Sequence, residues 1–299
     1  MIEFRMLHRF LLHLIPILTL LLSVSVPANA QNTAQPDPSL RPTLESVFNS
    51  WQVAINSDDL AQWEASTAYS RQIEIRNRIV SQKLPFPQAL FEDPMGAPSL
   101  EGLIGLGVLS TGVTATSTYF GKANFGSADG VAITDNLVVL HFLKEEGSWK
   151  FDNLRIVKIG NDAEILLQIR NSDFSFLNGL EFQPAPQLPP IPQPVNTPEY
   201  IAEVWVDATG FEVTVEVNGH PSGTFANMKT TSLVMGGVRP GQNTVRLTTK
   251  LLENAEGASP NIEIGIYAAR DASSQANRVF HYRPGSAVQP ALIQNFNVE

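Results

Sequence analysis

The sequence predicts two folded parts of different class, an α+β domain followed by an all-β sandwich domain. Apolar residues recur with the period of an amphipathic helix between residues 43 and 82, and with the period of a β-strand between residues 113 and 159. From Tyr200 onward there is no long helical period, and short alternating segments are separated by glycine and proline. Helices followed by an antiparallel meander are typical of α+β folds, whereas many short strands are typical of a sandwich.

The first 30 residues have the three parts of a secretory signal peptide. Arg5, His8 and Arg9 form a basic start, and a mostly aliphatic stretch follows. Small residues then precede an expected cleavage site after Ala30. An uncleaved membrane anchor is the alternative, but the apolar stretch of about 15 residues is shorter than the roughly 20 needed to cross a bilayer. We therefore expect a secreted or periplasmic bacterial protein with no membrane span after signal cleavage.

The composition argues against several functional classes. The chain of 299 residues has no cysteine and a net charge of −9, so its stability has to come from its cores. It has no dense basic patch, and nucleic-acid binding is therefore not expected. Neither a cofactor nor a metal is expected, because the histidines after residue 30 are isolated and spread over both parts. We find no catalytic motif and predict no catalytic residue.

Three helices are expected in the first domain. The first starts with Thr43 as its N-cap, and the second starts after Ser57. The third covers residues 66–84 and is ended by Pro85 and Pro87.

The third helix carries two polar residues in the middle of its apolar face, Gln72 and Arg76. A buried guanidinium is costly unless it is paired or hydrogen-bonded. One interpretation is that Arg76 pairs with an internal carboxylate or extends outward to solvent. The other is that Gln72 and Arg76 line a polar cavity that holds an anionic or carbonyl-bearing ligand.

Residues 113–159 predict antiparallel strands. A hairpin is expected from Leu137–Leu143 to Trp149–Ile159, with the turn at residues 145–148. Tyr119 lies on an earlier strand of this region, and His141 shares a sheet face with its apolar neighbours. A structural histidine is the simpler interpretation of His141, and a pocket-lining residue is the alternative.

The first domain resembles the NTF2-like (SnoaL-like) family over about residues 43–160. The resemblance rests on a "W…N.DDL..W" pattern from Trp51 to Trp63 and on the closing "EEGSWKFDNLRIVKI". It implies a cone-like fold in which a curved sheet wraps a long helix around a pocket, and pairing of two copies through the sheet as a homodimer. Because the family mixes enzymes with binding domains, it implies no activity. Enzymes of the family place acid or base residues, often Asp, His or Tyr, in the cone. The positions that could match here are Tyr69, Tyr119 and His141, and we assign none of them a catalytic role.

The expected boundaries follow from the changes in composition. They are a signal peptide (residues 1–30), a flexible start (31–42), the NTF2-like α+β domain (43–182), a proline-rich linker (183–198) and the β-sandwich domain (199–299). Residues 183–200 hold seven of the 21 prolines, and in polyproline form such a run is a semi-rigid spacer. The alternative is that Leu188 and Ile191 pack on one of the domains. The PxxP pattern in the run also leaves a docking role open.

The last hundred residues predict seven or eight short strands, with a tight hairpin turn at Asn218-Gly219. The "VNG" hairpin and "GGVRPGQNTVRLTT" resemble accessory β-sandwich domains of secreted bacterial proteins. Some of those bind sugars on exposed aromatic residues, which makes Trp205 a candidate for glycan stacking.

Three functions are compatible with these observations. The leading one is an exported, non-enzymatic binding or assembly protein of the bacterial cell envelope, with an unknown small molecule or envelope component as its partner. The second is a small-molecule enzyme or ligand carrier whose pocket is lined by Gln72, Arg76, Tyr119 and His141. The third is carbohydrate binding through Trp205.

Overall fold

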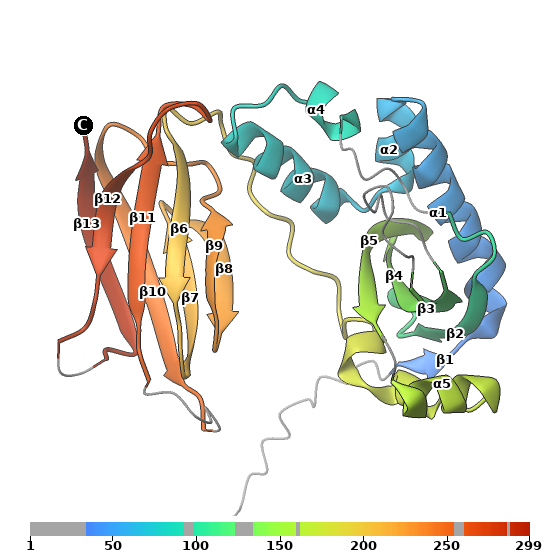
Figure 1. The fold of residues 1–299 in the computed structure, drawn as a ribbon. Coiled ribbons are helices and arrows are strands. Elements are labelled where there is room, and N and C mark those ends of the chain that lie inside the picture. The colour runs from blue at the N-terminus through green and yellow to red at the C-terminus, as the bar shows by residue number, and fades with distance from the viewer. Residues whose placement is uncertain (1–33, 93–98, 123–133, 160–161, 254–259, 286–287) are drawn as a thin grey trace, which may run out of the picture. The chain divides into compact units, whose positions relative to one another are not determined.

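A computed structural model describes residues 34–92, 99–122, 134–159, 162–253, 260–285 and 288–299 (Figure 1). The helices are α1 (Arg41–Asn56), α2 (Leu60–Ser66), α3 (Tyr69–Ser81), α4 (Gln88–Phe91) and α5 (Ala163–Arg170), with 3-10 turns η1 (Pro38–Leu40), η2 (Ser175–Asn178) and η3 (Leu180–Phe182). The strands are β1 (Gln35–Pro36), β2 (Ile104–Ser110), β3 (Thr114–Gly121), β4 (Asn136–Glu145), β5 (Ser148–Lys158), β6 (Ile201–Asp207), β7 (Phe211–Val217), β8 (His220–Ala226), β9 (Lys229–Leu233), β10 (Gly241–Leu251), β11 (Glu263–Ala269), β12 (Asn277–Tyr282) and β13 (Ala291–Val298). The expected signal peptide lies outside the described residues.

The expected fold class, a cone-like α+β domain followed by an all-β sandwich, is wrong. The protein is mostly β, with 41% strand and 24% helix, and it is built from three antiparallel sheets and a few short helices. The segments with a helical period do form helices, but these helices are short. Among the described helices, α1 is the longest at 16 residues. Residues 162–182 add eight residues of α-helix and two 3-10 turns; the helix ends at Arg170, and Ser172 follows with φ of 56°.

The first sheet has five strands in the order β1-β2-β3-β4-β5. Helix α1 covers one face, and the cluster that they share is Leu44, Phe48, Val108, Ala115, Tyr119, Val138, Leu140, Phe142 and Phe151. Helix α5 and the 3-10 turns contribute to the cluster on the other face, with Leu106, Leu137, Val139, Ile159, Leu177 and Phe182. Because both faces are covered, β3 and β4 are buried along most of their length instead of alternating.

The helix starts differ from those expected. Helix α1 begins at Arg41, with Pro42 in its first turn, so Thr43 lies inside the helix. Asp59, not Ser57, is the N-cap of α2, and its carboxylate accepts a hydrogen bond from the backbone N–H of Gln62 at 2.9 Å. Ser57 instead follows the last turn of α1.

The two expected hairpin turns are confirmed. Glu146 and Gly147 connect β4 to β5 with φ of 50° and 83°. Asn218 and Gly219 connect β7 to β8 with φ of 51° and 85°. Positive φ at both central residues is the geometry that such two-residue turns require, and Asn and Gly adopt it readily.

Residues 201–298 form two four-stranded antiparallel sheets, in the orders β13-β10-β7-β8 and β12-β11-β6-β9. Both sheets contribute to one apolar cluster, which includes Val204 and Ile264 from one sheet and Val215 and Leu247 from the other. The alternation in β7 is regular, with every second residue buried. This regularity agrees with the period of two in the sequence.

The proline-rich run is attached by hydrogen bonds rather than free. Buried Asn77 of α3 donates to the carbonyl of Gln193 at 2.8 Å and accepts from the N–H of Val195 at 2.9 Å. Arg76 donates to the carbonyl of Val195 at 3.0 Å, and Thr114 of β3 donates to the carbonyl of Ala185. Since proline lacks an N–H, the run has few donors of its own, and side chains of α3 and β3 satisfy its carbonyl groups.

Asp207 at the end of β6 is a buried carboxylate with four hydrogen-bond donors. It accepts from the N–H and hydroxyl of Thr209, from the amide of Asn261 at 2.8 Å, and from Lys229 at 2.9 Å. Burial by itself would raise the pKa of Asp207, but these bonds outweigh it and lower the pKa to about 2.

We expect Asp207→Asn to remove an acid-dependent part of the stability. A lowered pKa contributes stability that is present above about pH 4 and is lost as the pH falls toward 2, here on the order of 1–2 kcal/mol. Urea unfolding at pH 6, 4 and 2.5 should show the parent losing its advantage over the variant across this range. An advantage that is constant with pH would contradict the prediction.

Candidate functional site

A pocket of about 530 Å³ lies where the first sheet, α3 and the proline-rich run meet. We call it the Tyr69 pocket. It is lined by Glu64, Thr67, Tyr69, Ser70, Gln72, Leu143, Lys144, Glu145, Glu146, Lys150, Leu188, Pro189 and Ile191. The volume falls within the range of roughly 300–1,000 Å³ that is usual for small-molecule sites.

The start of α3 forms one side of the pocket. Its N-cap, Ala68, has no side chain that could accept a hydrogen bond. Glu145 at the end of β4 takes this role, since its two carboxylate oxygens lie 3.0 and 3.1 Å from the N–H of Tyr69. A carboxylate at a helix N-terminus is stabilised by the helix dipole. The contact therefore fixes α3 against the hairpin and leaves the Tyr69 ring about half exposed.

Gln72 connects the elements on the same side. Its amide donates to the carbonyl groups of Glu64 and Thr67, both at 2.8 Å, and so joins the end of α2 to the first turn of α3. Gln72 is the one member of the predicted pocket set that lines the Tyr69 pocket. Both N–H groups of the Gln72 amide are already hydrogen-bonded, so Gln72 forms part of the pocket wall and has no donor left for a ligand.

Two buried hydroxyl groups at the pocket are unsatisfied. Thr67 is 1% exposed and Ser70 is 7% exposed, and neither hydroxyl has a hydrogen-bond partner among the described residues. Each hydroxyl can donate one bond and accept two. Leaving such a group unpaired costs about 1–3 kcal/mol. Both hydroxyl oxygens are closed off from solvent, so they lie behind the pocket wall and do not face a ligand in the pocket.

The charged groups of the lining are largely engaged within the protein. Lys150 donates to the carbonyl of Ala65, and the ammonium of Lys144 lies 5.6 Å from the centre of the Trp149 ring. Glu64 and Glu146 add two more carboxylates to that of Glu145. The lining therefore carries more negative than positive charge.

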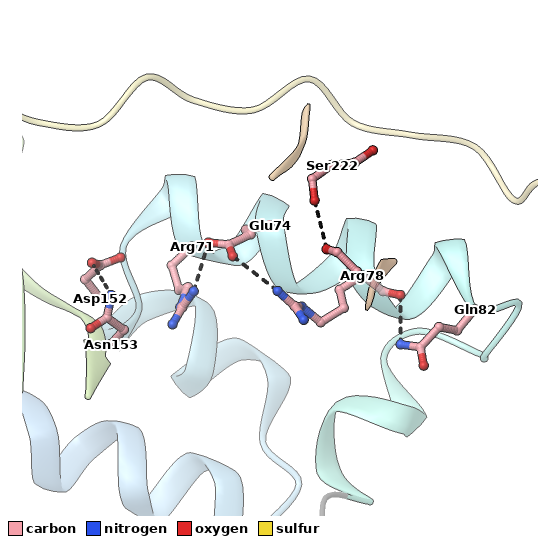
Figure 2. Close-up of polar contacts among 8 residues, drawn as sticks. Arg71, Glu74, Arg78, Gln82, Asp152, Asn153 and Ser222 are labelled. Carbon is pink, nitrogen blue, oxygen red and sulfur yellow. Dashed lines mark hydrogen bonds and ion pairs between the residues drawn. The ribbon is translucent and has the colours of Figure 1, made fainter. Parts of the chain in front are cut away.

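A cluster of ionisable groups lies beside the pocket, around a β-bulge. The bulge in β5 leaves Asp152 as the extra residue opposite His141 and Phe142 of β4. Burial raises the pKa of Asp152, and the Arg71 guanidinium opposes that shift. In Figure 2, Glu74 lies between Arg71 and Arg78 along α3, with Asp152 on the Arg71 side; Arg71 contacts Glu74 at 2.8 Å.

His141 belongs to this cluster and not to the pocket lining. It shares its sheet face with Leu143, which does line the pocket. Burial lowers the pKa of His141 to about 4, and the charges of Arg155 and Arg71 add to the effect. The imidazole is therefore neutral at pH 7.

Tyr119 lies on the opposite face of the sheet from His141. It is buried in the cluster that α1 covers, and its hydroxyl donates to Glu45 of α1 at 3.0 Å and accepts from Ser117. Burial is the largest cause that raises the pKa of Tyr119. Tyr119 is thus separated from Gln72 and His141 by the sheet, and the predicted pocket set is not brought together.

Arg76 occupies a place that the sequence did not indicate. The Arg76 guanidinium donates to the backbone of the proline-rich run, whereas the expected partner was a carboxylate or a ligand. Trp205 is partly exposed on the face of β6 that is turned away from the apolar core, opposite Gly265 of β11 and Thr231 of β9. The glycan-stacking hypothesis for Trp205 stays a prediction.

No family model, curated protein or solved structure matches the chain. The two family resemblances drawn from the sequence therefore stay predictions. Within the described ranges, no helix is long and apolar enough to cross a bilayer. In the same part of the chain, no group of three or more His, Asp or Glu side chains is placed to hold a metal ion.

Proposed function

We propose that the protein is an exported, non-enzymatic binding protein of the bacterial cell envelope, and that the Tyr69 pocket holds its ligand. The observation that carries the proposal is a pocket of ligand size whose wall includes the partly exposed side chains of Tyr69, Leu188 and Ile191. A ligand that covers this apolar surface would stabilise the folded protein.

We expect no catalytic turnover, because two ionisable groups of the pocket are already bound within the protein. Glu145 is bound to the start of α3, and Lys150 is bound to a backbone carbonyl. A general acid or base has to reach the substrate within hydrogen-bond distance, and these two groups already have partners. Export is supported by the basic, apolar and small-residue segments of residues 1–30.

An enzyme that uses the His141 and Asp152 cluster is the second candidate. Its support is that two neighbouring groups have pKa values displaced in a partly buried setting, which is common at active sites. The two candidates differ in one observable: a binding protein returns its ligand unchanged.

We expect a pocket-filling substitution to abolish ligand binding. Ile191 is 60% exposed at the pocket wall, so Ile191→Trp should occupy the pocket without disturbing a core. Ligands would first be identified from a small-molecule library by thermal shift and ligand-observed NMR. Binding of a pocket ligand should then weaken by at least about 10-fold, or 1.4 kcal/mol, in Ile191→Trp.

The matched control is Ile293→Trp, because Ile293 is 58% exposed on β13 and lies outside the pocket. The control should bind as the parent does. Equal binding in both variants would place the ligand elsewhere, and conversion of the ligand that His141→Gln abolishes would favour the enzyme instead.

A further inference from the structure

The polar groups of the Tyr69 pocket that remain open to a ligand are mainly hydrogen-bond acceptors. Glu64 and Glu146 are exposed, and neither carboxylate has a hydrogen-bond donor or an ion-pair partner within the described residues. The Gln72 amide uses both of its N–H groups inside the protein, whereas its oxygen accepts no bond from that part of the chain. A ligand that donates hydrogen bonds therefore finds three acceptor groups in the lining.

The two lysines of the lining are each held by a neighbouring residue. Lys150 donates to the carbonyl of Ala65, which lies in the last turn of α2 and has no partner inside the helix. Lys144 lies directly opposite Trp149 in the β4–β5 hairpin, and its ammonium is 5.6 Å from the centre of that ring. Because both ammonium groups are engaged and two carboxylates are not, the pocket favours a positive charge over a negative one.

The remaining wall of the pocket is apolar and open to solvent. The Tyr69 side chain is 49% exposed, and Leu188 and Ile191 of the proline-rich run are 41% and 60% exposed. Hydrogen bonds from Asn77 and Arg76 hold the run just beyond these residues. The face of a tyrosine ring packs against apolar groups and also attracts a cation, so this wall suits a ligand that has both.

We propose that the Tyr69 pocket binds an organic cation, which is an ammonium group carried on an apolar body. The ammonium only donates hydrogen bonds, and it matches the open acceptors of Glu64, Glu146 and Gln72. The apolar body covers the ring of Tyr69 and the exposed side chains of the proline-rich run. This assignment rests on the proposed function, because it names the class of ligand for the same pocket.

The test uses the purified protein and defined probes. 2-Phenylethylamine, 2-phenylethanol and 3-phenylpropanoate share an aromatic apolar body and are cationic, neutral and anionic at neutral pH, whereas spermidine is a cation without such a body. NMR titrations that follow the backbone amides of Tyr69 and Ile191 give the dissociation constants at the pocket. The amine should bind about 10-fold more tightly than each of the other three probes, and about 1 M salt should reduce its advantage over the alcohol.

Substitutions in the lining separate the charge from the apolar surface. Glu64→Gln and Glu146→Gln keep the size of the side chain, and the double variant should weaken the amine by about 5-fold and leave the alcohol unchanged. Tyr69→Leu keeps an apolar group and removes the ring face, so it should weaken the amine more than the alcohol.

Two matched controls lie on the sandwich, outside the pocket. Glu203 of β6 is another exposed carboxylate, and Tyr267 of β11 is another exposed tyrosine. Glu203→Gln and Tyr267→Leu should leave the dissociation constant of the amine unchanged. An equal loss in the controls would mean that the amine responds to the overall charge of the protein, and it would overturn the assignment.

The outcomes distinguish this assignment from the proposed function. If the alcohol or the acid binds as tightly as the amine, the cation is wrong and the pocket remains a binding site. If spermidine equals the amine, the apolar body is wrong. An amine that produces no saturable shift at Tyr69 and Ile191, or that binds the Glu64→Gln, Glu146→Gln double variant as it binds the parent, also overturns the assignment. The comparison of Ile191→Trp with Ile293→Trp then decides the proposed function separately.

Discussion

Replacing Asn77 by alanine is expected to lower the free energy of unfolding by about 2–3 kcal/mol, because the buried N–H of Val195 and the part-buried carbonyl of Gln193 lose their partner at once. The amide of Asn77 is 4% exposed and bonds to the carbonyl of Gln193 and to the N–H of Val195. Alanine is the better helix former, so helix propensity would act in the opposite direction by a few tenths of a kcal/mol. A loss of this size is therefore attributable to the contact with the proline-rich run.

Urea unfolding measures the loss, and hydrogen exchange of the Val195 amide shows where it arises. The exchange of this amide should become much faster in Asn77→Ala, since its acceptor is gone. Arg78→Ala is the control on the same helix, because the Arg78 side chain is 57% exposed and forms an ion pair with Glu74 of α3 at 3.7 Å. A free energy within about 0.5 kcal/mol of the parent would mean that Asn77 does not hold the run.

The features that could be predicted from the sequence are those set by neighbouring residues. The turn at Asn218-Gly219 follows from the positive φ that Asn and Gly tolerate, and the structure has it. Helix α3 follows from its apolar period, although it is shorter at both ends than residues 66–84. The balance of helix and strand was mispredicted, because it depends on how far each short segment extends after packing.

The candidate site could not be assembled in this way, because its parts are far apart along the chain. Arg76 and its acceptor are 119 residues apart, and Tyr69 and Glu145 are 76 apart. The sequence placed Arg76 on the apolar face of the helix but could not indicate a backbone carbonyl as its partner. Tertiary contacts of this kind leave no local pattern.

One signal in α3 could have indicated a second buried face. Ser70, Asn77 and Ser81 recur at i, i+7 and i+11, and all three are buried. Small polar residues at helical spacing mark a surface that packs against polar groups, here the proline-rich run at Asn77 and the backbone N–H of Gly236 at Ser81. The apolar face of α3 therefore accounts for only part of the contacts that the helix makes.

The second large effect is expected from His141 as the pH falls. Its pKa is lowered to about 4 by burial first, and then by Arg155 and Arg71, whereas an unfolded chain has a histidine pKa of about 6.5. Between these values the unfolded chain binds the proton and the folded protein does not. Stability is therefore full above about pH 6.5 and falls by about 2–3 kcal/mol as the pH approaches 4.

His141→Gln should remove this loss, because glutamine does not titrate. Urea unfolding of parent and variant at pH 7.5, 6, 5 and 4 would show the difference between them changing by about 2–3 kcal/mol in favour of the variant at low pH. Arg155→Gln tests the cause, since Arg155 is exposed on β5 and its removal should raise the pKa of His141. NMR titration of the imidazole reports that pKa directly. A value at or above 6.5 in the folded parent would contradict the placement of His141 against the two arginines, and with it the support for an enzyme built on this cluster.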